Sequence, residues 1–164
     1  MAVLNAFYGN NKVAIVGDSQ TAKDIVSALK AANFKNVFAV DAPSSYASYY
    51  KLSEAKPVYT LFVEEAAQCK VKTTKIQGLS KERLGKEINR DDTESRKAQS
   101  FYKHNLKMIG IDPAFLGTVE IPLDEVRDIN WFYEDKSPML HLFVPRTDGV
   151  AQAVCESIKD YFKK

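Results

Sequence analysis

Short apolar runs alternate with helical periodicity in the first part of the chain. Residues 12–16 (KVAIV) form a β-branched run that ends at Gly17, which predicts a buried parallel strand. Apolar residues then recur at the spacing of one helix face, at Ala22, Ile25, Val26, Leu29 and Ala32. Asn33 marks the end of this helix, and residues 37–40 (VFAV) form a second buried run. This order predicts a right-handed, parallel strand–helix–strand unit.

The middle of the chain continues the alternation. A turn over residues 41–45 (DAPSS) precedes a short helix predicted over residues 46–54. Pro57 then breaks the chain before a third buried strand, residues 58–63 (VYTLFV). Residues 71–76 alternate β-branched residues with polar ones, which predicts an exposed edge strand or flap. Its lysines would then prevent the edge from pairing with other chains.

The second half is more charged. Residues 80–97 predict one or two surface helices, and a further helix is predicted to run to Met108. A loop over residues 110–117 is expected to precede a short strand at residues 118–121. Residues 139–144 (MLHLFV), between two prolines, predict a fifth strand.

A last helix is predicted after Thr147 or Asp148, with a core stripe at Val150, Val154, Ile158, Tyr161 and Phe162. Cys155 falls on its apolar side and is expected to be a small core residue. The alternation of strands and helices predicts an α/β fold, a three-layer α/β/α sandwich with a mostly parallel sheet. The 164 residues are expected to form a single domain.

Charge and cysteine content exclude several classes of protein. The 23 basic and 21 acidic residues argue against a dedicated nucleic-acid binder, which carries a basic face. Two cysteines far apart predict neither a disulfide framework nor a metal site. We expect no apolar membrane span, no signal peptide, and a location in the cytoplasm or in a particle assembled there.

Candidate chemistry gathers where the strands end, because ligands of open α/β sheets bind at the carboxyl ends of the strands. Residues 41–45, 64–65 and 145–149 are expected to share this rim with the first strand–helix turn. The oxyanion or ligand-binding residues expected there are Gly17, Asp18, Gln20, Ser44 and Ser45.

A dinucleotide site is disfavoured at this rim. Asp41 lies where a ribose-binding acid would be, but the first turn reads GDSQTA rather than GxGxxG. Asp18 would also place a negative charge where a pyrophosphate must bind. We therefore predict no cofactor and no metal.

Ser19 is the candidate nucleophile, because a serine in this turn lies beside backbone N–H groups that can bind an oxyanion. It needs a histidine base, for which His141 near the C-terminal strand end is the candidate. The structural alternatives are a helix N-cap for Ser19 and a half-buried, hydrogen-bonded strand histidine for His141.

Two segments carry a family resemblance. Residues 13–21 (VAIVGDSQT) resemble the first block of the SGNH, or GDSL-type, hydrolases, in which the GDS serine follows the first strand. His141-Leu142 followed by residues 147–149 (TDG) is similar to that family's last block. The resemblance implies an SGNH-like or flavodoxin-like sandwich. It also implies that Ser19 acts as nucleophile and His141 as base on an ester such as an acetylated sugar or a lipid.

The chain departs from the family pattern in three places. The glycine of the family's second block would fall near residues 43–45 (PSS), where there is none. Pro138 occupies the position of the acid that precedes the family's histidine by three residues. Glu64 and Glu65 begin the segment that replaces the GxND block. The sequence therefore favours a catalytically silent relative over an active enzyme.

Clustered aromatic residues support an alternative function. Tyr46, Tyr49 and Tyr50 lie together, as do residues 131–133 (WFY), and such residues anchor protein interfaces. The other interpretation is that they fill the two outer layers of the sandwich. The alternative is a non-enzymatic binding or assembly protein, such as a virion subunit, forming a homo- or hetero-oligomer without nucleic acid or membrane.

Overall fold

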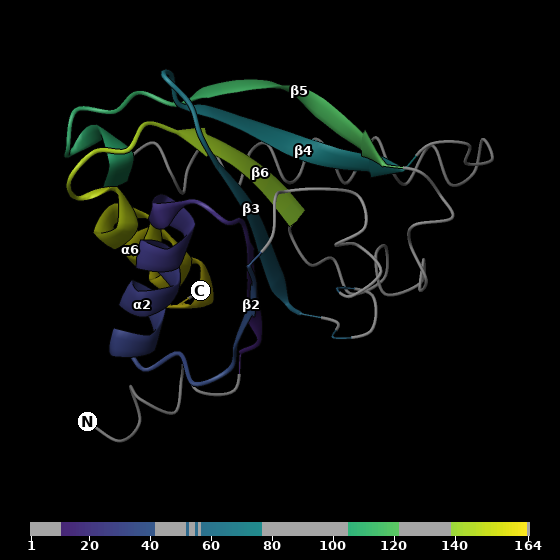
Figure 1. Cartoon of the computed structure of the whole chain (residues 1–164), viewed down its shortest axis with the longest axis vertical. Coiled ribbons are helices and arrows are strands. Elements are labelled where there is room, and N and C mark those ends of the chain that lie inside the picture. The colour runs from purple at the N-terminus through teal and green to yellow at the C-terminus, as the bar shows by residue number, and fades with distance from the viewer. Residues whose placement is uncertain are drawn as a thin grey trace.

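A computed structural model of the chain describes residues 11–41, 52, 55, 57–76, 105–121 and 139–163. Within these residues a single sheet of six strands has the order β2-β1-β3-β6-β4-β5 (Figure 1). The strands are β1 (Val13–Val16), β2 (Val37–Val40), β3 (Tyr59–Glu65), β4 (Lys70–Ile76), β5 (Ala114–Ile121) and β6 (Met139–Val144). The helices are α2 (Gln20–Ala31) and α6 (Val150–Lys163).

The sheet is mostly parallel. β1 lies between β2 and β3, β6 follows β3, and all three of these pairings are parallel. β4 and β5 are parallel to each other, and β4 is antiparallel to β6. The predicted α/β class with a mostly parallel sheet is therefore confirmed.

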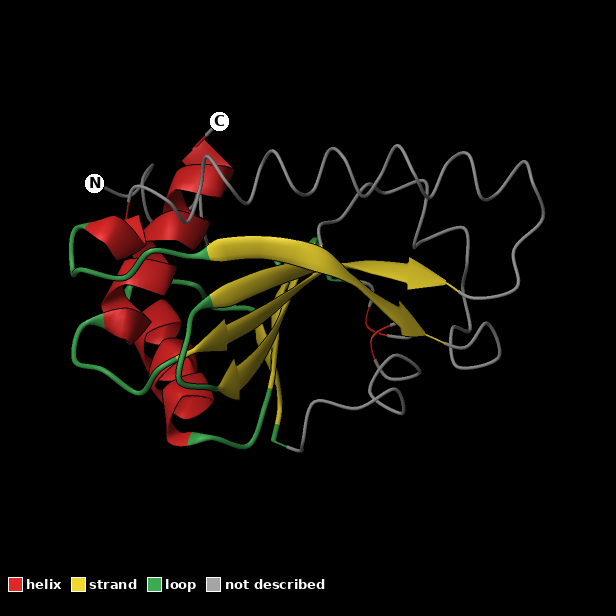
Figure 2. Ribbon diagram, turned by 90° about the horizontal axis from the view of Figure 1, so that it is seen from above, coloured by secondary structure: helices red, strands yellow, loops and turns green. Residues whose placement is uncertain are grey.

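Helices α2 and α6 cover the same face of the sheet (Figure 2). Alternate strand residues point to this face, and they form one apolar cluster with both helices. Cys155 is fully buried in the cluster, so the prediction of a core cysteine is confirmed. Buried members from the elements of this face include Ile15, Ile25, Leu29, Leu61, Leu142, Val154 and Ile158.

The other face of the central strands is buried as well. Ala14 and Val16 of β1 are 0% exposed, and their register partners on β3, Thr60 and Phe62, are equally enclosed. A sheet buried on both faces is the arrangement of the predicted three-layer sandwich. We call the two sides the helix-covered face and the opposite face.

Helix α2 ends just before Asn33, the residue at which the sequence predicts its end. Asn33 has a positive φ of 73°, the left-handed conformation that asparagine tolerates better than most residues. The Phe34 amide donates to the Leu29 carbonyl at 3.0 Å and the Asn33 amide to the Lys30 carbonyl at 3.2 Å. This is a Schellman motif, closed by the buried side chains of Phe34 and Leu29.

Two strand predictions need correction. The prediction of an edge strand at residues 71–76 is wrong, because β4 lies between β6 and β5. The loop predicted over residues 110–117 is also wrong in its second half, since β5 begins at Ala114 and includes Gly117. A register shift in the β4–β5 ladder between Val71 and Thr73 accommodates this irregular strand.

Several predictions lie outside the described residues. These are the surface helices over residues 80–97, the two aromatic clusters, Ser44 and Ser45. Of the predicted helix at residues 46–54, only Leu52 is described, and it is helical. Among the described residues, no helix has the length and apolar character needed to cross a membrane.

Candidate functional site

The carboxyl ends of the four parallel strands lie along one edge of the sheet, as predicted. The Gly17 amide donates to the Val40 carbonyl at 3.1 Å, which joins the ends of β1 and β2. The Ala66 amide donates to the Val144 carbonyl at 3.0 Å, which joins the ends of β3 and β6. The turn over residues 17–20 therefore shares its edge with residues 64–65 and 145–149.

Gly17 sets the close approach of α2 to the sheet. A Cβ at this position would lie 2.7 Å from the Val63 carbonyl oxygen and 2.9 Å from the Ala22 Cβ. No side chain fits such a gap without moving backbone, so the turn requires glycine. The glycine that the sequence placed on an oxyanion rim has a packing role in the strand–helix turn.

Ser19 is the N-cap of α2. Its Oγ accepts a hydrogen bond from the Ala22 amide at 3.2 Å, and its backbone φ of −78° is extended. Its neighbours Asp18 and Gln20 are exposed, and the Gln20 amide donates to the Asp24 carboxylate at 2.8 Å. The structure thus gives Ser19 the capping role that is the structural alternative to a nucleophile.

His141 lies on β6 and is 7% exposed. Its ring stacks on Phe62, with centroids 4.5 Å apart and planes inclined by 10°. Burial, and then the nearby Lys72 ammonium, lower the pKa of His141 from 6.5 to about 3. A general base works best with a pKa near the operating pH, so this imidazole is a weak proton acceptor.

The structure does not bring Ser19 and His141 to one side of the sheet. Leu140 and Leu142 belong to the core cluster on the helix-covered face, so the residue between them points to the opposite face. Ser19 begins α2, which packs on the helix-covered face. The serine precedes the histidine along the chain, as in the SGNH family. The face of the sheet on which His141 lies, however, is decided by the register of β6.

The residues beside His141 were not predicted as site residues from the sequence. Phe62 on β3 and Lys72 on β4 lie beside it in register, so the opposite face carries an aromatic–imidazole–lysine row. One row back, the Thr60 Oγ is buried and has no hydrogen-bond partner among the described residues. Alternate residues of a strand share a face, so the sequence YTLFV could have predicted that Thr60 and Phe62 lie on the same face.

The carboxyl rim itself is acidic and open. Asp18, Asp41, Glu64 and Glu65 are all exposed. No group of three potential metal-ligating side chains occurs in the described part of the chain.

Comparisons with known proteins give no family. No protein-family model and no curated protein match the chain. A solved structure of a Campylobacter jejuni 5'-methylthioadenosine/S-adenosyl homocysteine nucleosidase is similar at 14% identity, over 94% of this chain and 96% of that chain. Its TM-score of 0.37 is too low to support an argument about function.

Proposed function

We propose that the chain is a non-enzymatic binding or assembly domain, and that any kinship with the SGNH hydrolases is that of a catalytically silent relative. The observation that carries this proposal is the position of His141. Its ring is buried against Phe62 on the face opposite to the helix that Ser19 begins. Nucleophilic catalysis by serine requires a base within about 2.6–3.2 Å of the hydroxyl.

Electrostatics support the same conclusion. A serine hydrolase stabilises the imidazolium with a carboxylate behind the histidine. Here burial, and then the Lys72 ammonium, lower the pKa of His141, and both oppose a positively charged ring. These two effects favour the neutral imidazole, whereas a catalytic triad favours the protonated ring during the reaction.

Hydrolysis of a generic acyl ester tests the proposal. We expect the same rate for the wild type, Ser19→Ala and the control Ser27→Ala, an exposed serine in the middle of α2. Loss of the cap costs Ser19→Ala about 1 kcal/mol of stability, so the assay is run well below its melting temperature. A rate that falls only in Ser19→Ala and His141→Gln would overturn the proposal.

Self-assembly is the second arm of the test. Light scattering across a range of concentrations is expected to show a species larger than one chain, alone or after addition of a partner from the same source. A protein that stays monomeric at every concentration and binds no added partner would contradict the proposed binding role.

A small SGNH-type esterase is the second candidate function. One observation favours it, because Ser19 follows the first strand and begins a helix, where that family keeps its serine. The opposite-face position of His141 is the reason we rank it second. The ester assay above distinguishes the two candidates directly.

A further inference from the structure

Two lysines of β4 lack the role that an edge strand would give them. Lys70 and Lys72 alternate with the buried Val71, and lysines on an edge prevent pairing with other chains. However, β4 is an interior strand with neighbours on both sides. Both lysines are half-buried there, so their presence needs another explanation.

Both lysines are register neighbours of the same segment of β6. In the β4–β6 ladder Lys70 lies opposite Phe143 and Lys72 lies opposite His141. The Lys72 Nζ is 5.4 Å from the centre of the Phe143 ring, so this side chain leans along the strand toward the Lys70 position. Because alternate residues share a face, the three side chains lie together on the opposite face.

The positive charge at this place is not neutralised within the described residues. No carboxylate there forms an ion pair with Lys70 or Lys72. Glu64 lies on the other side of Phe143 in register and is exposed. On the inner side, the buried imidazole is held neutral, partly by the Lys72 charge. Two lysines two residues apart on one face of a strand carry like charges that repel each other, and a bound anion would offset this repulsion.

We propose that Lys70, Lys72 and Phe143 form a binding site for an aromatic phosphate monoester. The dianionic phosphate would neutralise both ammonium groups, and the aromatic group would lie against the half-buried ring. The site rests on the proposed function, because it supplies a ligand class for a binding domain. It lies on a different surface from the Ser19 turn.

Calorimetric titration of the whole chain with phenyl phosphate tests the site. Phenyl phosphate is expected to bind more tightly than inorganic phosphate, and phenol is expected not to bind. Lys70→Gln and Lys72→Gln are each expected to weaken binding about tenfold, since a charge-assisted contact is lost. The matched controls Lys23→Gln and Lys30→Gln, exposed lysines of α2, are expected to bind as the wild type does.

Phe143→Leu separates the ring from the charges. It is expected to abolish the preference for phenyl phosphate while binding of inorganic phosphate persists. A nucleoside 5'-monophosphate arm shows whether a larger planar group is accepted. If a glutamine variant unfolds, Lys→Arg at the same position preserves the charge and is expected to preserve binding.

Three outcomes would overturn the inference. These are no binding of phenyl phosphate to the wild type, equal losses in the β4 and α2 lysine variants, and binding that does not weaken as salt is raised. Failure of this site leaves the ester and light-scattering tests unchanged. Conversely, Ser19-dependent hydrolysis would remove the proposed function without affecting phosphate binding by the lysines.

Discussion

The two faces of the sheet are buried in different ways. On the helix-covered face, α2 and α6 enclose an almost wholly apolar cluster that contains Leu61 and Leu142. On the opposite face, the neighbouring residues in the same strands include a threonine, a phenylalanine and a histidine, all under about a tenth exposed: Thr60 0%, Phe62 2% and His141 7%. The strand residues on the helix-covered face are therefore apolar, whereas those on the opposite face include a buried threonine and a buried histidine.

This difference has an energetic consequence. Apolar side chains stabilise in proportion to the area that they bury, whereas a buried polar group costs free energy unless it is hydrogen-bonded. Because buried polar groups of this kind lower stability, their positions are where a functional role is expected. The neutral histidine, the unsatisfied threonine and the lysines beside Phe143 distinguish the opposite face in this respect.

The largest effect is expected on the helix-covered face. Leu142→Ala removes a fully buried side chain from the apolar cluster and should lower the free energy of unfolding by about 2–5 kcal/mol. Chemical denaturation measures the change. A loss below about 1 kcal/mol would mean that this face is not the main source of stability.

The next largest effect is the pH dependence that His141 gives to the free energy of unfolding. Its folded-state pKa of about 3 lies below the ordinary value of 6.5, so the unfolded chain takes up the proton first as pH falls. This group's contribution to the free energy of unfolding should then decrease by about 1.4 kcal/mol per pH unit between the two pKa values. Denaturation at a series of pH values measures the slope.

A matched variant isolates this contribution, because carboxylates titrate in the same range. His141→Gln should flatten the pH dependence, whereas substitution of the chain's second histidine, His104→Gln, should leave the His141 contribution in place. Proton NMR of the imidazole gives the pKa directly. A His141 signal that titrates near pH 6.5 would contradict its neutral, enclosed state.

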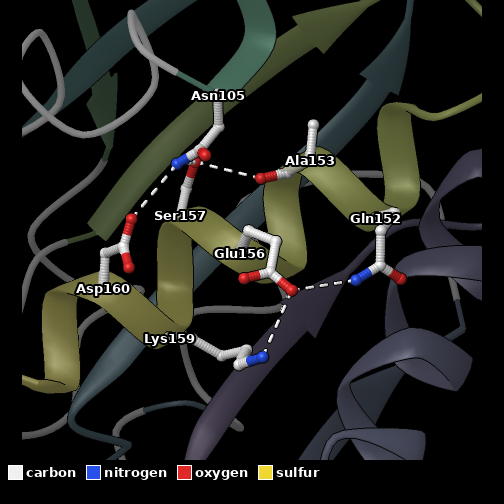
Figure 3. Close-up of polar contacts among 7 residues, drawn as sticks. All are labelled: Asn105, Gln152, Ala153, Glu156, Ser157, Lys159 and Asp160. Carbon is white, nitrogen blue, oxygen red and sulfur yellow. Dashed lines mark hydrogen bonds and ion pairs between the residues drawn. The ribbon is translucent and has the colours of Figure 1, made fainter. Parts of the chain in front are cut away.

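The buried hydroxyls of Ser157 and Thr60 allow a direct comparison of the two sides of the sheet, because one is hydrogen-bonded and the other has no partner among the described residues. On the helix side, the Ser157 Oγ of α6 donates to the Ala153 carbonyl at 3.1 Å and accepts from the Asn105 amide at 3.0 Å (Figure 3). Asn105 also donates to the Asp160 carboxylate, so it ties the start of residues 105–110 to α6. Ser157→Ala should cost about 1–3 kcal/mol, because the two hydrogen bonds of a buried hydroxyl are lost. An unchanged denaturation midpoint would show that this network contributes nothing.

Thr60→Val on the opposite face should have the smallest effect, and of opposite sign. The substitution keeps the shape of the side chain and removes a hydroxyl that has no partner among the described residues. We expect stabilisation by about 1 kcal/mol, measured by thermal and chemical denaturation. A destabilised variant would show that Thr60 is hydrogen-bonded in solution.

Much of the fold could be predicted because its signals are local. The β1–α2–β2 unit follows from two apolar runs and one helical stripe. The end of α2 follows from the ability of Asn33 to adopt a positive φ. Ser19 as a cap and Cys155 as a core residue follow from their positions within a single helix. Each of these features depends on residues a few positions apart in the chain.

Tertiary structure alone decided the neighbourhood of the candidate site. β6 comes from the far end of the chain and lies between β3 and β4, which makes β4 an interior strand. The same register turns His141 toward Phe62 and Lys72 and away from the side of Ser19. Strand order and register depend on contacts between distant segments, and a shift of one residue reverses the face of every side chain. The sequence by itself therefore determined the elements, and the assembled sheet determined which side chains meet.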